Sequence, residues 1–352
     1  MGRLSNFGRS VRPSPPHDNP AQPATSPRTH GPSIITRPAT PGELPLALRL
    51  ALGSNGTPAD EQHVEHFVEF AAGRGIDTAQ VWLAVRSAEP SARDGAVIHA
   101  ALLPIVSPGR TMLLLGGSAQ VKPAAVPDPI GPAGQLIEAV CAHFAARSLQ
   151  LAQVLLDPSD EPARRLYERH DFRRIAHLLY LQTSSRRRYP LPPLPDYFTW
   201  LPYSPQSHGL FVRTIARTYE GSLDCPSLNG LRDMEDVVAG HKASGDFEPG
   251  LWTLLLERGE PLGALLLSPT RASDTMELVY LGLVPAARGR GVADLMVRHA
   301  LATTASAGVS RLSLAVDADN VPALRLYYRH GLKRVAGKLA MMRLLHGQWR
   351  NG

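Results

Sequence analysis

Glu277 to Asp294 reads E-L-V-Y-L-G-L-V-P-A-A-R-G-R-G-V-A-D. Residues 278–284 form an apolar run with β-branched and aromatic members that stops at Pro285, which is typical of a strand. A short Arg/Gly loop follows, and then a helical pattern begins. Backbone N–H groups without partners at a helix N-terminus, together with the helix dipole, favour a bound phosphate. The stretch therefore predicts a strand, an anion-binding loop and a helix in that order.

The rest of the chain repeats one order of strands and helices twice. Residues from Asp157 and from Asp317, compared over twenty positions, are identical at ten of them, which supports an internal repeat. The first copy predicts strands at 34–37, 81–85, 97–106, 112–115, 151–156 and 177–182, with helices at 43–52, 59–72, 134–147 and 162–170. The second predicts strands at 197–201, 251–257, 262–268, 276–284, 312–316 and 339–344, with helices at 209–218, 232–241, 289–307 and 322–330.

This pattern predicts an α/β fold with a mixed sheet in each of two tandem domains. The domains are expected at 33–183 and 196–346, each about the size of an ordinary domain. Residues 184–195 are Pro-rich and predict an extended linker. Residues 1–32 are rich in Pro, Ser and Arg, with few large apolar side chains, and so predict a disordered tail.

Charge and cysteine content narrow the function classes. The net charge is +6, but residues 1–32 contribute +3 and Arg186–Arg188 another +3, so the predicted domains are close to neutral. A nucleic-acid footprint is expected as a patch on a domain, so we expect no nucleic-acid partner. No apolar run is long enough for a bilayer, and the tail lacks the apolar core of a signal peptide. With two cysteines only, a reducing cytoplasm is the expected compartment.

Two motifs in residues 277–332 resemble those of the GNAT (N-acetyltransferase) superfamily. The pattern [Q/R]-x-x-G-x-[G/A] is met by Arg288, Gly291 and Ala293. The later pattern N-x-x-A-x-x-x-Y-x-x-x-G-[F/L] begins at Asn320 and has its tyrosine at Tyr327. The tandem arrangement with an altered first copy resembles mycothiol synthase and related tandem GNAT proteins. The resemblance at fold level covers about residues 33–346, whereas the motifs lie only in the second copy.

The resemblance implies a sheet that opens between its fourth and fifth strands and acetyl-CoA as co-substrate, without a metal. The pantetheine arm would pair with the strand that ends at Leu283 and Val284, and a backbone N–H near Leu283 would bind the thioester carbonyl. The remaining residues implied for cofactor binding are Arg288, Gly289, Arg290, Gly291, Val292, Ala293 and Asn320.

The resemblance also implies the groups that move protons. Direct attack of an amine on a thioester needs a base for the amine and an acid for the leaving thiolate. Glu277 is placed as the base, acting through water, and Tyr327 as the acid; a solvated glutamate and a packed tyrosine are the alternatives. Asp224 and Cys225 lie in the loop that lines the acceptor site of this superfamily, although a plain turn is equally consistent. No His/Asp pair accompanies Cys225, so we do not expect it to be a nucleophile.

The first copy departs from the motif at the loop. It has V-P-D-P-I-G-P-A-G at residues 126–134, where Pro132 removes one N–H donor. Its fourth strand has no carboxylate at the position of Glu277, Asp160 stands in place of Asn320, and Tyr167 is kept. We therefore expect this copy to be silent in catalysis and to shape the acceptor side of the second copy.

These observations predict an acetyl-CoA-dependent N-acetyltransferase that acts through a ternary complex in its second domain. The acceptor would be a primary amine on a small molecule or a peptide, and the oligomeric state is open. The alternative is a CoA-binding regulatory or scaffold protein without turnover, which need not keep Glu277 and Tyr327. A third hypothesis, nucleic-acid binding through the tail, predicts an affinity that falls steeply with salt.

Overall fold

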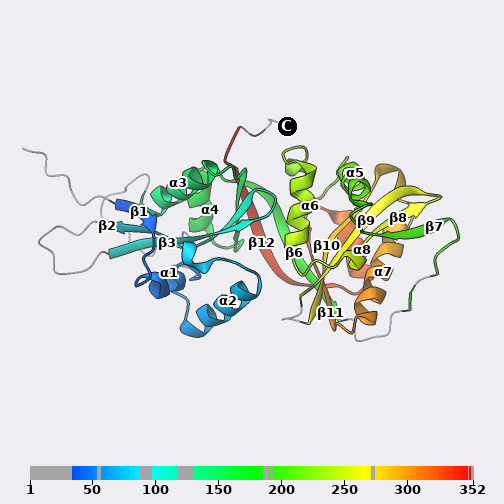
Figure 1. The fold of residues 1–352 in the computed structure, drawn as a ribbon, viewed down its shortest axis with the longest axis horizontal. Coiled ribbons are helices and arrows are strands. Elements are labelled where there is room, and N and C mark those ends of the chain that lie inside the picture. Colours follow the sequence, from blue (N-terminus) through cyan, green and yellow to red (C-terminus); the bar gives the residue numbers. More distant parts are fainter. Residues whose placement is uncertain are drawn as a thin grey trace, which may run out of the picture.

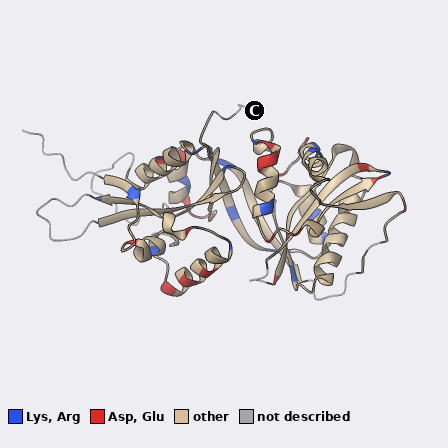
Figure 2. Cartoon of the chain, viewed as in Figure 1, with Lys and Arg blue, Asp and Glu red and all other residues tan. Residues whose placement is uncertain are grey.

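The computed structural model describes residues 34–53, 57–86, 97–116, 131–184, 190–191, 193–270, 274–347 and 349. The predicted tail 1–32 lies outside these residues, as do residues 185–189 and 192 of the predicted linker. Figure 1 shows an elongated molecule in which the two copies lie side by side, joined by long strands in the middle. In the view of Figure 2, basic and acidic residues are interspersed over the described elements of both copies.

Twelve described strands form one continuous sheet in the order β1-β2-β3-β4-β5-β12-β6-β11-β10-β9-β8-β7. The mixed sheet of an α/β fold is thereby confirmed, with both copies contributing to a single sheet. The strands of the first copy are β1 (Ile34–Pro38), β2 (Trp82–Arg86), β3 (Val97–Ser107), β4 (Thr111–Gly116), β5 (Leu151–Leu156) and β6 (Arg173–Ser184). Those of the second copy are β7 (Phe198–Pro202), β8 (Trp252–Glu257), β9 (Glu260–Thr270), β10 (Thr275–Leu283), β11 (Arg311–Asp317) and β12 (Lys333–Leu344).

The helices follow the order expected from the sequence in both copies. In the first copy they are α1 (Leu44–Ala51), α2 (Glu61–Gly73), α3 (Gly131–Ala145) and α4 (Glu161–Arg169). In the second they are α5 (His208–Thr218), α6 (Met234–Ala243), α7 (Val292–Ser306) and α8 (Val321–Arg329). The α6 helix begins two residues later than expected, because Asp233 caps it by accepting from the Glu235 N–H.

The last strand of each copy pairs with the other copy. β6 of the first copy pairs antiparallel with β11 of the second, from Leu178–Asp317 to Ser184–Arg311. β12 at the end of the chain pairs with β5 of the first copy, and β6 and β12 pair with each other at the centre of the sheet (Figure 1). β6 and β12 are also longer than the predicted 177–182 and 339–344, because each has a strand on both sides. The two copies have thus exchanged their final strands.

The sheet opens between the fourth and fifth strands of both copies. In the second copy, β10 and β11 pair in parallel only from Thr275 to Glu277, although both strands continue beyond that point. In the first copy, β4 and β5 pair only from Thr111 to Leu113. The expected gap is therefore present twice, and in the second copy Glu277 lies at its apex.

Two apolar clusters cover the two faces of the second copy. Met276 and Leu278 of β10 pack with α7 and α8. Tyr280 lies with α5 and α6 on the opposite face, after a bulge that shifts the register between Leu278 and Tyr280. Since side chains alternate between the faces of a strand, Glu277 points to the face that α5 and α6 cover.

Candidate active site

The loop before α7 has the backbone geometry of an anion site. Gly289 and Gly291 have φ values of +75° and +78°, which side chains other than glycine rarely adopt. A Cβ at either position would meet no protein atom within 4 Å, so the space above the loop is open. Among the described residues, the N–H groups of 289–293 find no acceptor. A run of N–H groups at a helix N-terminus is the kind of site that binds a phosphate group.

The two arginines of the loop have partners within the protein. Arg288 donates to the carbonyl oxygens of Leu283, Gly221 and Thr218, at 3.0 to 3.2 Å. Arg290 donates to Glu257 Oε1 at 2.6 Å. Arg288 therefore fixes the loop to the end of α5, and its implied contact with a cofactor stays a prediction. The backbone N–H groups of the loop remain available to an anion.

The backbone N–H groups of Leu283 and Val284 point to opposite sides of β10. The Val284 N–H donates to Leu262 O at 2.9 Å, and its side chain is buried in the core. The expectation that Val284 pairs with a cofactor is therefore wrong for its N–H, which faces β9. Successive N–H groups of a strand point to opposite sides, so the N–H of Leu283 faces the gap. Leu283 is thus the backbone donor that the structure leaves available.

The Glu277 carboxyl lies in a partly buried position that suits a base. Burial raises its pKa above the usual range, and the positive charge of Arg74 opposes that rise. Arg74 belongs to the end of α2 in the first copy and donates to the Ser244 carbonyl oxygen at 3.1 Å. The first copy therefore places a cation beside the candidate base of the second.

Replacing Arg74 with Met is expected to move the acidic limb of the pH–rate profile to higher pH. Removing the cation leaves burial unopposed, so the pKa of Glu277 rises and its base form appears only at higher pH. The rate on the alkaline plateau should stay close to the parent's. Arg49→Met is the matched control, since Arg49 also donates to a backbone carbonyl in the first copy. An unmoved limb would exclude this coupling.

Tyr327 lies on α8 in the same apolar cluster as Leu283. Its hydroxyl has no hydrogen-bond partner among the described residues. Burial raises its pKa, and the nearby charge of Asp224 adds to this, so the hydroxyl keeps its proton over the physiological range. A group that is always protonated and unbonded can serve as a proton donor.

Asp224 and Cys225 lie against the open end of β11. The Asp317 N–H donates to Asp224 Oδ1 at 3.3 Å, and burial raises the pKa of Asp224. Burial also raises the pKa of Cys225 to about 12, so a thiolate is not formed near neutral pH. The loop from α5 to α6 therefore reaches the gap, as the acceptor-site hypothesis requires, and the thiol stays unreactive.

Asn320 has a local role in the structure. Its side-chain oxygen accepts from the Ala323 N–H at 3.3 Å and caps α8. Asp160 caps α4 in the same way, accepting from Ala163 N at 3.0 Å. The N-x-x-A motif is therefore a capping motif. The Asn320 amide N–H₂ donates to none of the described residues, and its contact with a cofactor stays a prediction.

In the first copy the gap is bridged by a hydrogen bond. The Tyr167 hydroxyl, completely buried, donates to the carbonyl oxygen of Gly116 at the end of β4 at 2.9 Å. Among the residues described, none accepts a hydrogen bond from Tyr327, so the equivalent tyrosines of the two copies differ in their hydrogen bonding. The histidines that follow them behave alike: His170 bonds Glu138 and His330 bonds Asp294, each at 2.8 Å. This supports a shared structural role for the histidines. Residues 126–130 of the altered loop lie outside the described residues.

Residues 215–332 match the family model described as Acetyltransferase (GNAT) family. This part of the chain is a GNAT domain. The chain is 38% identical over 79 residues to a mycothiol acetyltransferase of Jonesia denitrificans, which covers 22% of this chain and 25% of that protein. It is 30% identical over 185 residues to a mycothiol acetyltransferase of Amycolatopsis mediterranei. This match covers 50% of this chain and 60% of that protein. The chain thus spans a quarter to three fifths of the length of these curated relatives.

The solved structures extend the GNAT fold to both copies. A GCN5-related N-acetyltransferase from Sphaerobacter thermophilus covers 89% of this chain and 96% of its own, with a TM-score of 0.57 and 21% identity. The glucosamine N-acetyltransferase region of a fungal multi-domain β-N-acetylglucosaminidase covers 89% of this chain and 38% of its own, with a TM-score of 0.54 and 14% identity. The tandem GNAT architecture expected from the motifs is confirmed.

Within the described residues, no helix is long and apolar enough to cross a membrane. In the same part of the chain, His, Cys, Asp and Glu side chains form no cluster suited to a metal ion.

Arg74, Arg232 and Tyr280 belong to the surroundings of the site and were missed by the sequence reasoning, because no motif marks them.

Proposed function

We propose that this protein is an acetyl-CoA-dependent N-acetyltransferase with its reaction centre in the second copy. The observation that carries the proposal is the run of unpaired N–H groups at 289–293 beside an open strand edge that begins at Glu277. The first copy lacks a carboxylate at this point, and Tyr167 bridges its gap. A single active copy is therefore the arrangement that we infer.

The reaction needs no covalent enzyme intermediate. The amine nitrogen of the acceptor attacks the thioester carbon as Glu277 takes up the amine proton through water. The Leu283 N–H stabilises the oxygen that becomes negative. The carbon–sulfur bond then breaks, and the thiolate of CoA takes the proton of the Tyr327 hydroxyl. The raised pKa of Cys225 supports direct transfer, since this thiol would not compete as a nucleophile.

Replacing Tyr327 with Phe is expected to lower kcat by about a hundredfold, at the lower end of the range for general acid catalysis. The affinity for CoA should hardly change, because the ring and its packing are kept. Tyr167→Phe is the matched control: it removes the bond to Gly116 O and should lower stability without affecting turnover. Equal kcat values for the Tyr327 variant and the parent would remove this residue as the acid.

A panel of primary amines, scored by acetyl-CoA consumption, tests the proposal as a whole. The panel should contain the acceptor of the mycothiol acetyltransferases, small amino sugars, amino acids and peptides. Titration with CoA alone separates the alternative: saturable CoA binding without turnover of any amine would favour a regulatory CoA-binding protein. The two cysteines in the described residues are free, and a reducing cytoplasm is the compartment that we propose.

A further inference from the structure

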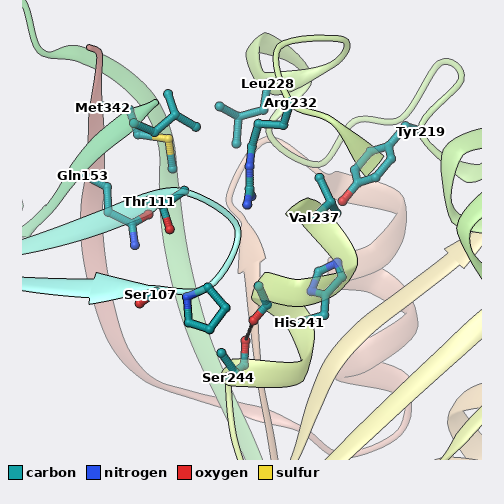
Figure 3. A pocket seen from close by; sticks show the side chains of 14 residues that line it. Ser107, Thr111, Gln153, Tyr219, Leu228, Arg232, Val237, His241, Ser244 and Met342 are labelled. Atoms are coloured by element: carbon teal, nitrogen blue, oxygen red, sulfur yellow. Dashed lines mark hydrogen bonds between the residues drawn. The ribbon is translucent and has the colours of Figure 1, made fainter. Parts of the chain in front are cut away.

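A cavity of about 250 Å³ lies between the two copies. Figure 3 shows that β4 and β5 of the first copy contribute Thr111 and Gln153 to it, while the region of α5 and α6 contributes Tyr219, Arg232 and His241. Its volume is below the roughly 300–1,000 Å³ of most sites for drug-sized ligands. The cavity therefore suits a compact molecule, or one end of a longer one.

Arg232 is the charged residue of this cavity, and its charge is incompletely satisfied. Its Nη2 donates to the carbonyl oxygens of Gly109 at 3.3 Å and Asp236 at 3.2 Å. The Asp236 carboxylate is engaged by Arg110, whose Nε lies 2.7 Å away. Among the described residues, the enclosed Nε of Arg232 meets no acceptor, and Nη1 donates to none. The hydrogen bonds of this partly buried cation go to neutral carbonyl oxygens, and the nearby Asp236 carboxylate, which acts on its charge, is already bonded to Arg110. An anion in the cavity would therefore be a favourable partner.

The side chains of His241 and Tyr219, which also line the cavity, do not neutralise the charge of Arg232. Burial, with a smaller effect of Arg232, lowers the pKa of His241 to about 4, so this histidine is neutral at physiological pH. Its Nε2 is buried without a partner among the described residues. Burial also raises the pKa of Tyr219 to about 12. In Figure 3 the guanidinium of Arg232 reaches into the middle of the ring of labelled side chains.

The cavity is close to Glu277. Ser244 lines it, and the carbonyl oxygen of Ser244 accepts from Arg74, the cation that acts on the Glu277 carboxyl. The next residue, Gly245, is so close to Ser268 that a Cβ on it would lie 2.3 Å from the Ser268 hydroxyl. Ser268 is the β9 partner of Glu277. Ser244, Gly245 and Ser268 therefore connect the wall of the cavity to the strand position of Glu277.

We propose that this cavity binds the acceptor through an oxyanion, a carboxylate or a phosphate, that Arg232 holds. The inference rests on the proposed function, and it names the acceptor class as small amines that also carry an anionic group. Charge-assisted hydrogen bonds favour such an anion over a neutral group of equal shape. Thr111 and Gln153 of the first copy complete the wall, so the silent copy contributes to acceptor selection.

The test compares amines that differ only in the anion. Glycine and glycinamide form the carboxylate pair, and glucosamine 6-phosphate and glucosamine form the phosphate pair. We expect the anionic member of at least one pair to have a kcat/KM about tenfold or more above its neutral partner, in line with one hydrogen bond to a charged group. Arg232→Met should bring that ratio close to one, and Arg232→Lys should retain part of it. Because the ratio is taken within one variant, a general loss of folded protein cancels.

Arg343→Met is the matched control, since Arg343 of β12 pairs with Glu138 of α3 and also joins the copies. It should leave the ratio unchanged. A parent enzyme without preference in either pair, or an Arg232→Met variant with the parent's preference, would overturn the proposal. Thermal unfolding with inorganic phosphate against chloride at equal ionic strength gives a readout that needs no turnover. The phosphate-specific rise in Tm should be larger for the parent than for Arg232→Met, and equal rises would also overturn it.

The acetylation assay and the thermal unfolding with phosphate distinguish failure of the proposed function from failure of the proposed anion site. If no amine is acetylated but phosphate stabilises the parent through Arg232, the proposed function fails and the anion site stands. If neutral amines are acetylated with no role for Arg232, the proposed function stands and the anion site fails.

Discussion

Replacing Glu277 with Gln is expected to lower kcat by about 10²–10⁴-fold, the usual range for loss of a general base. Gln keeps the shape of the side chain but cannot accept the amine proton. The acidic limb of the pH–rate profile should disappear as well. In the parent, burial raises the pKa of Glu277, so the base form is lost as the pH falls through that raised value. Steady-state kinetics across pH, with CoA affinity measured separately, check both effects.

Glu260→Gln is the control for this substitution, because Glu260 is an exposed residue at the start of β9. It should leave kcat and the pH profile unchanged. If the Glu277 variant kept the parent's kcat and its acidic limb, the base would lie elsewhere. Asp224 would then be the next candidate, since burial raises its pKa too and it lies at the open end of the gap.

Replacing Gly291 with Val is expected to weaken CoA binding by about a hundredfold or more. A β-branched residue at φ +78° is strained, and relief of that strain is expected to displace the N–H groups of the loop. Losing two hydrogen bonds to a charged phosphate accounts for a change of this size. The new side chain would also enter the open space above the loop. Isothermal titration with CoA measures the effect directly.

Gly308→Val is the matched control for backbone strain. Gly308 follows the other end of α7 with φ +72°, and a Cβ there also meets no atom within 4 Å. Both variants should lose similar stability, whereas only the Gly291 variant should lose CoA affinity. Intact CoA binding by Gly291→Val would remove the loop as the pyrophosphate site.

Sequence patterns predicted the elements of this fold well, and their pairing poorly. Apolar periodicity identifies strands such as β10 and helices such as α7, because these depend on neighbouring residues. The exchange of β6 and β12 could not be predicted. The two strands descend from the same repeat and have similar patterns, so either would fit beside β5 or β11 as far as local chemistry decides.

The residues of the candidate site also differ in whether the sequence could predict their roles. Gly289 and Gly291 were predictable because a local backbone conformation requires glycine. The roles of Arg288 and Asn320 were only partly predictable, since their side chains satisfy nearby backbone groups in the fold. Arg74 and Arg232 could not be predicted from a motif. They act across the boundary between the copies, and only the three-dimensional arrangement brings them near Glu277.

The exchanged strands also set an order of events during synthesis. β5 needs β12 as its neighbour, and β12 lies near the end of the chain, so residues 151–156 must wait for residues 333–344 to leave the ribosome. The first copy therefore cannot form its final strand pairing while it is the only copy made. Pairing over such a sequence separation is slow, and waiting strand edges are prone to aggregate. A nascent chain stalled after residue 184 should thus depend on chaperones, because the exchanged strands make the two copies one folding unit.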